Sequence, residues 1–346
     1  MTNDRDVADM AARFRDVPAH ISSPLYQALA RTVTETPALL RLAARGRPGQ
    51  VPTFLLFGAV HALLLAGADH EMARYFPSVA GTAALPPDDA GPALVDFCAR
   101  YQRQLAATIE TRLVQTNVVK RALALWLGMA AIRRMEARPV HLIEVGASAG
   151  VLLRFDRYGY VLGGRSFGDL GSPVQIAAEW HAEWPVPNVE AIPDLASVSG
   201  VDLNPLDAGS ADDRTWLEAL VWPENHHEAA LLHDALAIVA ADPPPIWAGD
   251  AVEVCPTLAR ELPPGEPRVV FHAVTRLHVP PDRLAAFDAA IASLGDNAPL
   301  YWLSFEGRGE LDLRDPSGEV THLAQVEGHL EWVRPLGARP SWPLSR

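Results

Sequence analysis

Hydrophobic residues recur at helical spacing through the first third of the chain. Leu25, Leu29 and Val33 fall on one face with a period of 3.6 residues. The stretch 54–65 is apolar on nearly every side, which predicts a helix enclosed by other helices. Further helices are expected over residues 94–113, which is amphipathic, and 123–135. The pattern predicts an all-helical domain over residues 1–137.

The pattern changes after Ala137, where short apolar runs begin to alternate with helical stretches. The runs predict five strands, at 140–145, 198–203, 245–248, 268–274 and 300–305. Helices are predicted at 215–221, 228–240, 252–262 and 282–294. Because strands that alternate with helices form parallel sheets, residues 138–346 are expected to be an α/β domain with a doubly wound, mostly parallel sheet.

Two segments are expected to depart from this alternation. Residues 160–197 are rich in Gly, Pro and Trp and fit neither period, which predicts an insertion with a short hairpin at 160–164. Residues 310–314 and 321–326 flank a turn signal at 315–318 and predict a closing β-hairpin. A last strand is expected at 329–333.

Composition narrows the function classes. The chain has 346 residues, 49% hydrophobic and 21% charged, and a net charge of −13, which disfavours nucleic acid as a partner. The longest apolar run, 54–68, is shorter than the ~20 residues of a membrane-spanning helix, so no membrane association is expected. The two cysteines predict neither a disulfide framework nor a zinc site, and the cytoplasm is the expected location.

The end of the first predicted strand carries the most specific chemistry. Glu144 closes the strand, and Gly146, Ala147, Ser148 and Gly150 form a small-residue loop that lets backbone approach a ligand. A helix is expected over residues 151–158, with its N-terminus favouring a ligand carboxylate. The spacing differs from the dinucleotide motif G-x-G-x-x-G. The alternative is a Gly-rich turn that only joins strand to helix.

Polar residues follow the other predicted strands, and ligands of open α/β sheets bind at such ends. Asp202, with Leu203 beside it, is expected to bind ribose hydroxyls, and Asp250, with Ala251, an adenine amino group. Each aspartate has a simpler alternative, a turn former for Asp202 and a helix cap for Asp250. The fourth and fifth strands supply His272 and Glu306.

These motifs resemble known families. The α/β part resembles the Rossmann-like class of S-adenosylmethionine-dependent methyltransferases, through residues 144–150 and the closing hairpin. More narrowly, the chain resembles a bacterial family catalogued as domain of unknown function 2332. The residues that carry this resemblance are Gln115-Thr116-Asn117, Glu144 to Gly150, Asp156-Arg157-Tyr158, Asp202 to Asp207, Trp216-Leu217, Val221-Trp222-Pro223, Gly249-Asp250 and His272.

The resemblance implies an S-adenosylmethionine-dependent methyltransferase that acts on a small molecule, with residues 1–137 as lid or substrate domain. His272 is the first candidate base and Glu306 the second, while a hydrogen-bonded core histidine is the alternative for His272. The substrate side would use Thr116, Asn117, Arg121 and Trp222. No metal is expected. The rival hypotheses are a non-catalytic nucleoside-binding protein on the same fold and an NAD-dependent enzyme.

Overall fold

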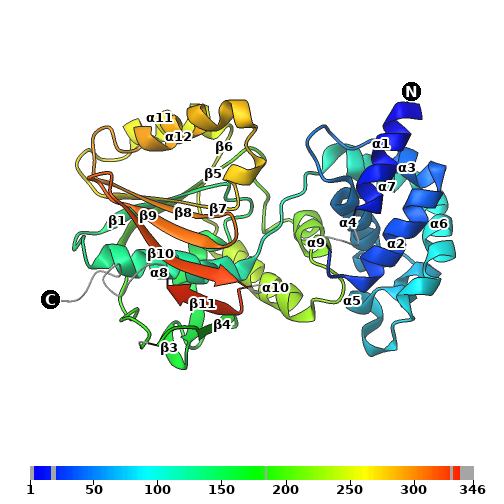
Figure 1. Cartoon of the computed structure of the whole chain (residues 1–346), viewed down its shortest axis with the longest axis horizontal. Coiled ribbons are helices and arrows are strands. Elements are labelled where there is room, and N and C mark those ends of the chain that lie inside the picture. The colour runs from blue at the N-terminus through cyan, green and yellow to red at the C-terminus, as the bar shows by residue number, and fades with distance from the viewer. Residues whose placement is uncertain (1–3, 17–20, 184, 328–329, 336–346) are drawn as a thin grey trace. The chain divides into compact units, whose positions relative to one another are not determined.

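A computed structural model describes residues 4–16, 21–183, 185–327 and 330–335 (Figure 1). Its contacts divide the chain into two units, Met1–Thr116 with Ser210–His233, and Asn117–Gly209 with Asp234–Arg346. The predicted boundary after residue 137 follows the change in sequence pattern, whereas this division follows packing. It assigns α8 (Ala122–Arg133) to the second unit, where that helix contacts strands of the sheet. The third boundary along the chain, after His233, falls inside α10 (His226–Ala241).

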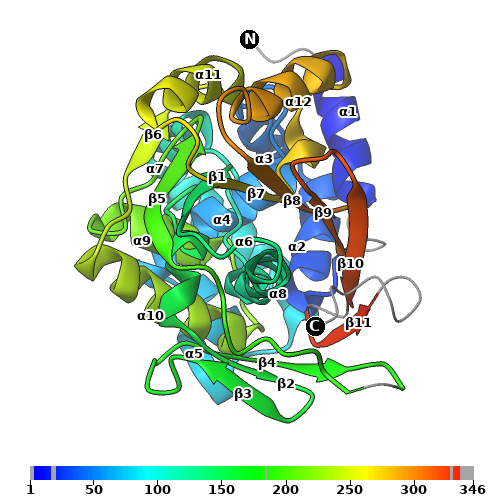
Figure 2. The same cartoon turned by 90° about the vertical axis from the view of Figure 1, so that its left-hand side faces the viewer.

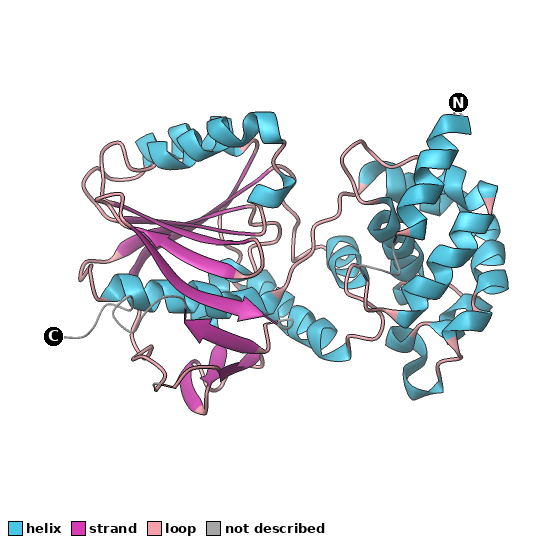
Figure 3. Ribbon diagram, viewed as in Figure 1, coloured by secondary structure: helices cyan, strands magenta, loops and turns pink. Residues whose placement is uncertain are grey.

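The described elements of the first unit are helices packed around α4 (Figure 3). Residues 54–65 are enclosed as predicted, since α4 buries side chains on every face, among them Leu56, Phe57 and Val60. The α-helices are α1 (Asp4–Arg15), α2 (Pro24–Glu35), α3 (Pro37–Ala43), α4 (Pro52–Leu65), α5 (Pro77–Ala80), α6 (Gly91–Arg100), α7 (Gln102–Thr111) and α9 (Ala211–Ala219). Short 3-10 helices are η2 (Glu71–Tyr75), η3 (Gly81–Ala83) and η4 (Pro87–Asp89).

The single helix predicted over residues 94–113 is wrong. The chain forms α6 and α7 instead, which are separated at Tyr101, whose backbone angles of φ −103° and ψ 20° leave the helical region. The Tyr101 ring packs on Phe97 with centroids 4.6 Å apart. Since these residues are four positions apart, as neighbours on one helix face are, the amphipathic pattern continues through the break and does not reveal it.

The second unit is α/β and contains an eleven-stranded, mostly parallel mixed sheet. The five predicted parallel strands are present as β1 (Val140–Val145), β5 (Leu195–Asp202), β6 (Ile246–Ala248), β7 (Arg268–Ala273) and β8 (Leu300–Glu306). They lie in the spatial order β6-β5-β1-β7-β8. This is the 3-2-1-4-5 order of doubly wound sheets, which reverses between β1 and β7.

Helices cover both faces of this sheet (Figures 1 and 2). On one face, α11 (Ala251–Glu261) and α12 (Leu284–Ser293) share a core with Ile143 and Val270. On the other face, α8 approaches β8 so closely that a Cβ atom on Gly128 would lie 2.6 Å from both methyl groups of Leu303. Six of six residues of β1 are buried, as expected for a central strand covered on both sides.

The sheet continues beyond β8 through antiparallel strands. The closing hairpin is confirmed as β9 (Glu310–Arg314) and β10 (Val320–Glu327). The hairpin of the insertion is also confirmed, as β2 (Gly159–Leu162) and β3 (Arg165–Gly168). Next to it, β4 (Gln175–Trp180) pairs with β11 (Trp332–Pro335), which joins the insertion to the sheet. The predicted last strand began at His329, which lies outside the described residues.

The helix expected behind the first loop is shorter and tighter than predicted. Residues 152–157 form a 3-10 helix, η6 (Leu152–Arg157), interrupted by non-helical angles at Arg154. The side chain of Arg154 makes a long-range contact, since its Nε donates to the carbonyl of Asp242 at 2.8 Å. Among the described helices of the chain, none is long and apolar enough to cross a membrane.

Candidate functional site

The loops at the carboxyl ends of β1 and β7 meet where the strand order reverses. A Cβ atom on Gly146 would collide with the Thr275 side chain, whose hydroxyl donates to the carbonyl of Val145 at 3.1 Å. Gly146 also has φ +87°, which disfavours any residue with a Cβ atom. Glycine is therefore required here for a close approach of two loops, beside the point where doubly wound folds bind ligands.

The backbone amides of the Gly146–Gly150 loop are largely occupied within the protein. Gly146 and Ala147 donate to the carbonyl of Val201 at 2.8 and 3.3 Å, and Gly150 donates to the carbonyl of Ala147 at 2.7 Å. Ser148, in a left-handed conformation at φ +51°, donates to Oδ2 of Asp202 at 2.7 Å. The loop thus binds a carboxylate of its own chain where a dinucleotide-binding loop binds phosphate.

Asp202 connects three strand ends. Besides Ser148, its carboxylate accepts from the amide of Asn204 at 2.8 Å, and its carbonyl accepts from Gly249 at 2.8 Å. The predicted positions after β1, β5 and β6 are thereby brought together. Leu203, next in the chain, is 74% exposed.

Asp250 caps a helix, which is the simpler of the two roles that the sequence suggested for it. Its Oδ1 accepts from the amide of Val252 at 2.9 Å at the start of α11, and its Oδ2 lies 3.0 Å from Arg283. Ala251 is the first residue of that helix and is buried. Both carboxylate oxygens of Asp250 already have partners, so the expected contact with an adenine amino group would compete with them.

Glu144 is a buried acid whose Oε2 has no hydrogen-bond partner in the described part of the chain. Burial raises the pKa of Glu144 well above its usual range, the nearby Asp202 raises it further, and Arg121 opposes both. Arg121, in η5 (Val119–Arg121), donates to the carbonyl of Ala273 at 3.3 Å. Burial lowers the pKa of Arg121, while Glu306 and Glu144 act in the opposite direction.

His272 is fully buried, with both ring nitrogens in hydrogen bonds. The indole N–H of Trp302 donates to Nε2 at 2.9 Å, so Nδ1 carries the proton and donates to Oε1 of Glu306 at 2.7 Å. The same Glu306 oxygen accepts from the amides of Thr275 and Arg276, each at 3.0 Å. This geometry favours the hydrogen-bonded core histidine that the sequence left open, and the catalytic role stays a prediction.

Burial and hydrogen bonding act in opposite directions on Glu306. Burial raises its pKa, but the hydrogen bonds from His272 and from the amides of Arg276 and Thr275 outweigh burial and lower the pKa below its usual value. Glu306 is consequently an ionised acceptor that binds the end of β7 to the end of β8.

The four residues predicted for the substrate side do not share one unit. Asn117 donates from its side chain to the hydroxyl of Ser148 at 3.0 Å. With Arg121 it belongs to the second unit. We call these residues, together with Glu144, the Gly146–Gly150 loop, Asp202, His272 and Glu306, the strand-end site. Thr116 and Trp222 belong to the first unit. Sequence reasoning missed Thr275 and Trp302. Thr275 had a usable signal, since it follows β7 directly, but Trp302 lies inside a strand, where nothing distinguishes it from core.

The sequence of the chain matches a known protein family. Residues 8–335 match the family model of an uncharacterized protein conserved in bacteria, DUF2332. The chain belongs to this family. A search of curated proteins found no match. The DUF2332 match includes residues of both units, and with them every predicted site residue. No group of three or more potential metal ligands is present in the ranges that the structure describes.

Proposed function

We propose that the strand-end site binds S-adenosylmethionine and that the protein transfers its methyl group to a small molecule. The proposal treats the second unit as a methyltransferase-like fold and the helical N-terminal part as the substrate domain. One observation supports it above the others, the 2.7 Å hydrogen bond from the Ser148 amide to the Asp202 carboxylate.

This hydrogen bond indicates which ligand charge the site favours. Dinucleotide-binding loops direct their amides and a helix N-terminus at a pyrophosphate. Here the amides of Gly146, Ala147 and Ser148 donate to protein oxygens, and the carboxylate of Asp202 occupies the amide of Ser148. An anionic ligand would be repelled, whereas a sulfonium cation would be stabilised. The site therefore favours S-adenosylmethionine over NAD.

The ligand would supply an electrophilic methyl group on sulfur. Asp202 would accept hydrogen bonds from ribose hydroxyls, because an ionised carboxylate offers about four acceptor positions. The exposed Leu203 would contact the face of the adenine ring. Asn117 and Arg121 would border the acceptor. Positioning of the two reactants can contribute up to about 7–11 kcal/mol, so this reaction does not require a strong base.

Isothermal titration of the full chain with S-adenosylmethionine, S-adenosylhomocysteine and NAD tests the proposal. We expect binding of the first two and none of NAD. Asp202→Asn should weaken binding about tenfold, the loss of roughly one hydrogen bond to a charged group. Glu261→Gln, an exposed carboxylate at the end of α11, changes the net charge equally and should bind like wild type. Absence of binding to both sulfur compounds would refute the proposal.

A second candidate, non-catalytic binding of a nucleoside-type ligand, is favoured by His272. Its two nitrogens are held by Glu306 and Trp302, so no lone pair is available to remove a proton from a substrate. This candidate predicts S-adenosylmethionine binding without accumulation of S-adenosylhomocysteine during incubation with cell metabolites. Product formation that survives His272→Ala would instead support methyl transfer without a histidine base.

A further inference from the structure

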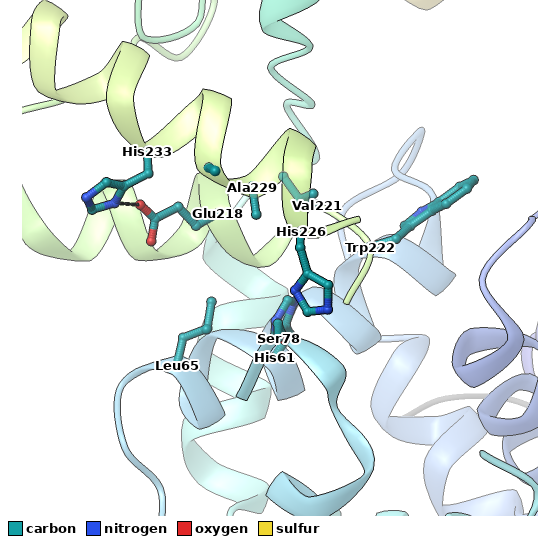
Figure 4. A pocket seen from close by; sticks show the side chains of 10 residues that line it. His61, Leu65, Ser78, Glu218, Val221, Trp222, His226, Ala229 and His233 are labelled. Carbon is teal, nitrogen blue, oxygen red and sulfur yellow. Dashed lines mark hydrogen bonds and ion pairs between the residues drawn. The ribbon is translucent and has the colours of Figure 1, made fainter. Parts of the chain in front are cut away.

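A cavity in the first unit contains a serine and a histidine that the strand-end site does not use (Figure 4). Its volume is about 250 Å³. This is below the ~300–1,000 Å³ of sites for drug-sized ligands, so only a small ligand would fit. The wall is mixed, with apolar side chains beside titratable ones. It consists of His61, Leu65, Ser78, Glu218, Val221, Trp222, His226, Ala229, Ala230 and His233.

The hydrogen bonds of His61 determine its tautomer. Nδ1 lies 2.9 Å from the carbonyl of Ala219, and a carbonyl can only accept, so Nδ1 carries the proton. Nε2 is then an acceptor, and it lies 2.7 Å from the hydroxyl of Ser78, which donates to it. A hydroxyl nucleophile, an imidazole base and a third group that orients the base form the arrangement of serine hydrolases. Here a backbone carbonyl takes the place of the usual carboxylate.

The surroundings keep the base neutral and the nucleophile accessible. His61, within α4, is 2% exposed, and burial lowers its pKa to about 4, with the Ala219 hydrogen bond opposing. The ring is therefore neutral at pH 7 and accepts a proton. Ser78, in α5, is partly exposed and lines the cavity. Glu218, paired with His233 at 2.9 Å, and His226 complete the titratable lining.

We propose that Ser78 is a nucleophile toward small acyl esters and that His61 is its general base. The Ser78 oxygen adds to the ester carbonyl carbon while its proton moves to Nε2 of His61. The carbon–oxygen bond to the alcohol then breaks, and the alcohol leaves with that proton. Water adds to the resulting acyl-serine, again with proton transfer through His61, and releases the carboxylic acid. Because a buried base of low pKa accepts protons reluctantly, the turnover is slow, and covalent labelling is the sensitive measurement.

The test is incubation of the full chain with a fluorophosphonate, which phosphonylates activated serines with loss of fluoride. We expect one adduct per chain by intact mass, assigned to Ser78 by peptide mapping. Ser78→Ala should abolish the adduct, and His61→Gln should slow labelling at least ~100-fold, the low end of general-base catalysis. Ser22→Ala, an exposed serine of the same unit, should label like wild type.

Denatured wild-type protein gives a check that needs no core substitution, because unfolding separates Ser78 from His61. Labelling should disappear on denaturation in urea. No adduct on the folded chain, an adduct only at another residue, or equal labelling of the folded and unfolded chain would overturn the proposal. Hydrolysis of p-nitrophenyl acetate that is lost in Ser78→Ala would extend the activity from the probe to an ester.

Discussion

At the scale of single residues, Gly146 is the position where the strand-end loop tolerates least change. Gly146→Ala adds a Cβ atom that collides with the Thr275 side chain and forces alanine to a φ of +87°. We expect a loss of about 2–5 kcal/mol in the free energy of unfolding, from a left-handed penalty of ~1–2 and an overpacking penalty of ~1–3 kcal/mol. Chemical denaturation measures it.

Gly265→Ala is the matched control for this prediction. Gly265 has a similar φ of +77°, but a Cβ atom there would meet nothing within 4 Å. Only the left-handed penalty of ~1–2 kcal/mol should remain. Equal losses in the two variants would mean that the loops relax, and that the close approach of Gly146 to Thr275 does not constrain the site.

Some site residues could be predicted from the sequence and others could not, for a physical reason. Asp202 ends β5 and Asp250 lies two residues beyond β6, and parallel strands bring their ends to one edge, so local pattern sufficed. The role of His272 depends on Trp302, thirty positions away and inside another strand. A strand pattern indicates which residues are buried but not which distant donor a buried ring meets.

At the scale of elements, the contact of α8 with β8 depends on a residue without a side chain. Gly128→Ala would place a Cβ atom 2.6 Å from both methyl groups of the fully buried Leu303. The gain in helix propensity is about 1 kcal/mol, and the overpacking cost is about 1–3 kcal/mol. We expect a net loss of stability, measured by calorimetry.

Gly58→Ala in α4 is the comparison, since its Cβ atom would lie 3.1 Å from Leu220 and 3.3 Å from Trp216. These neighbours need to move only slightly, so helix propensity should compensate and the variant should be about 1–2 kcal/mol more stable than Gly128→Ala. The opposite order would show that Leu303 has space to rearrange and that α8 is less closely packed than its geometry indicates.

The bounds of an element could be predicted from the sequence where burial alone determines its pattern of apolar residues. The predicted bounds of β1 are those observed, because a strand covered on both faces is mainly apolar in sequence, with His141 and Glu144 as the polar residues here. The break between α6 and α7 and the 3-10 form of η6 were not predictable. Tyr101 leaves the helical region although the apolar spacing continues across it, and the Arg154 side chain contacts the distant Asp242. The pairing of β4 with β11 is equally non-local, since it joins residues about 150 positions apart.

At the scale of the whole molecule, the half-buried Glu306 and the buried Glu144 should give the free energy of unfolding opposite dependences on pH. Glu306 has a lowered pKa, so its contribution is present above the usual glutamate pKa and is lost as pH falls through its folded value. Glu144 has a raised pKa, so the folded protein holds a proton that the unfolded chain releases. Stability should therefore fall as pH rises from about 4.3, the unfolded value, toward the raised pKa of Glu144.

Glu144→Gln separates the two effects, because glutamine keeps the shape and cannot ionise. We expect its stability relative to wild type to increase between pH 5 and pH 8, by an amount on the order of 1 kcal/mol. Urea denaturation at several pH values measures it, with Glu261→Gln as the exposed control that should show no such trend. A pH-independent difference would mean that Arg121 keeps Glu144 ionised throughout, so that the strand-end site contains a buried ion pair rather than a protonated acid.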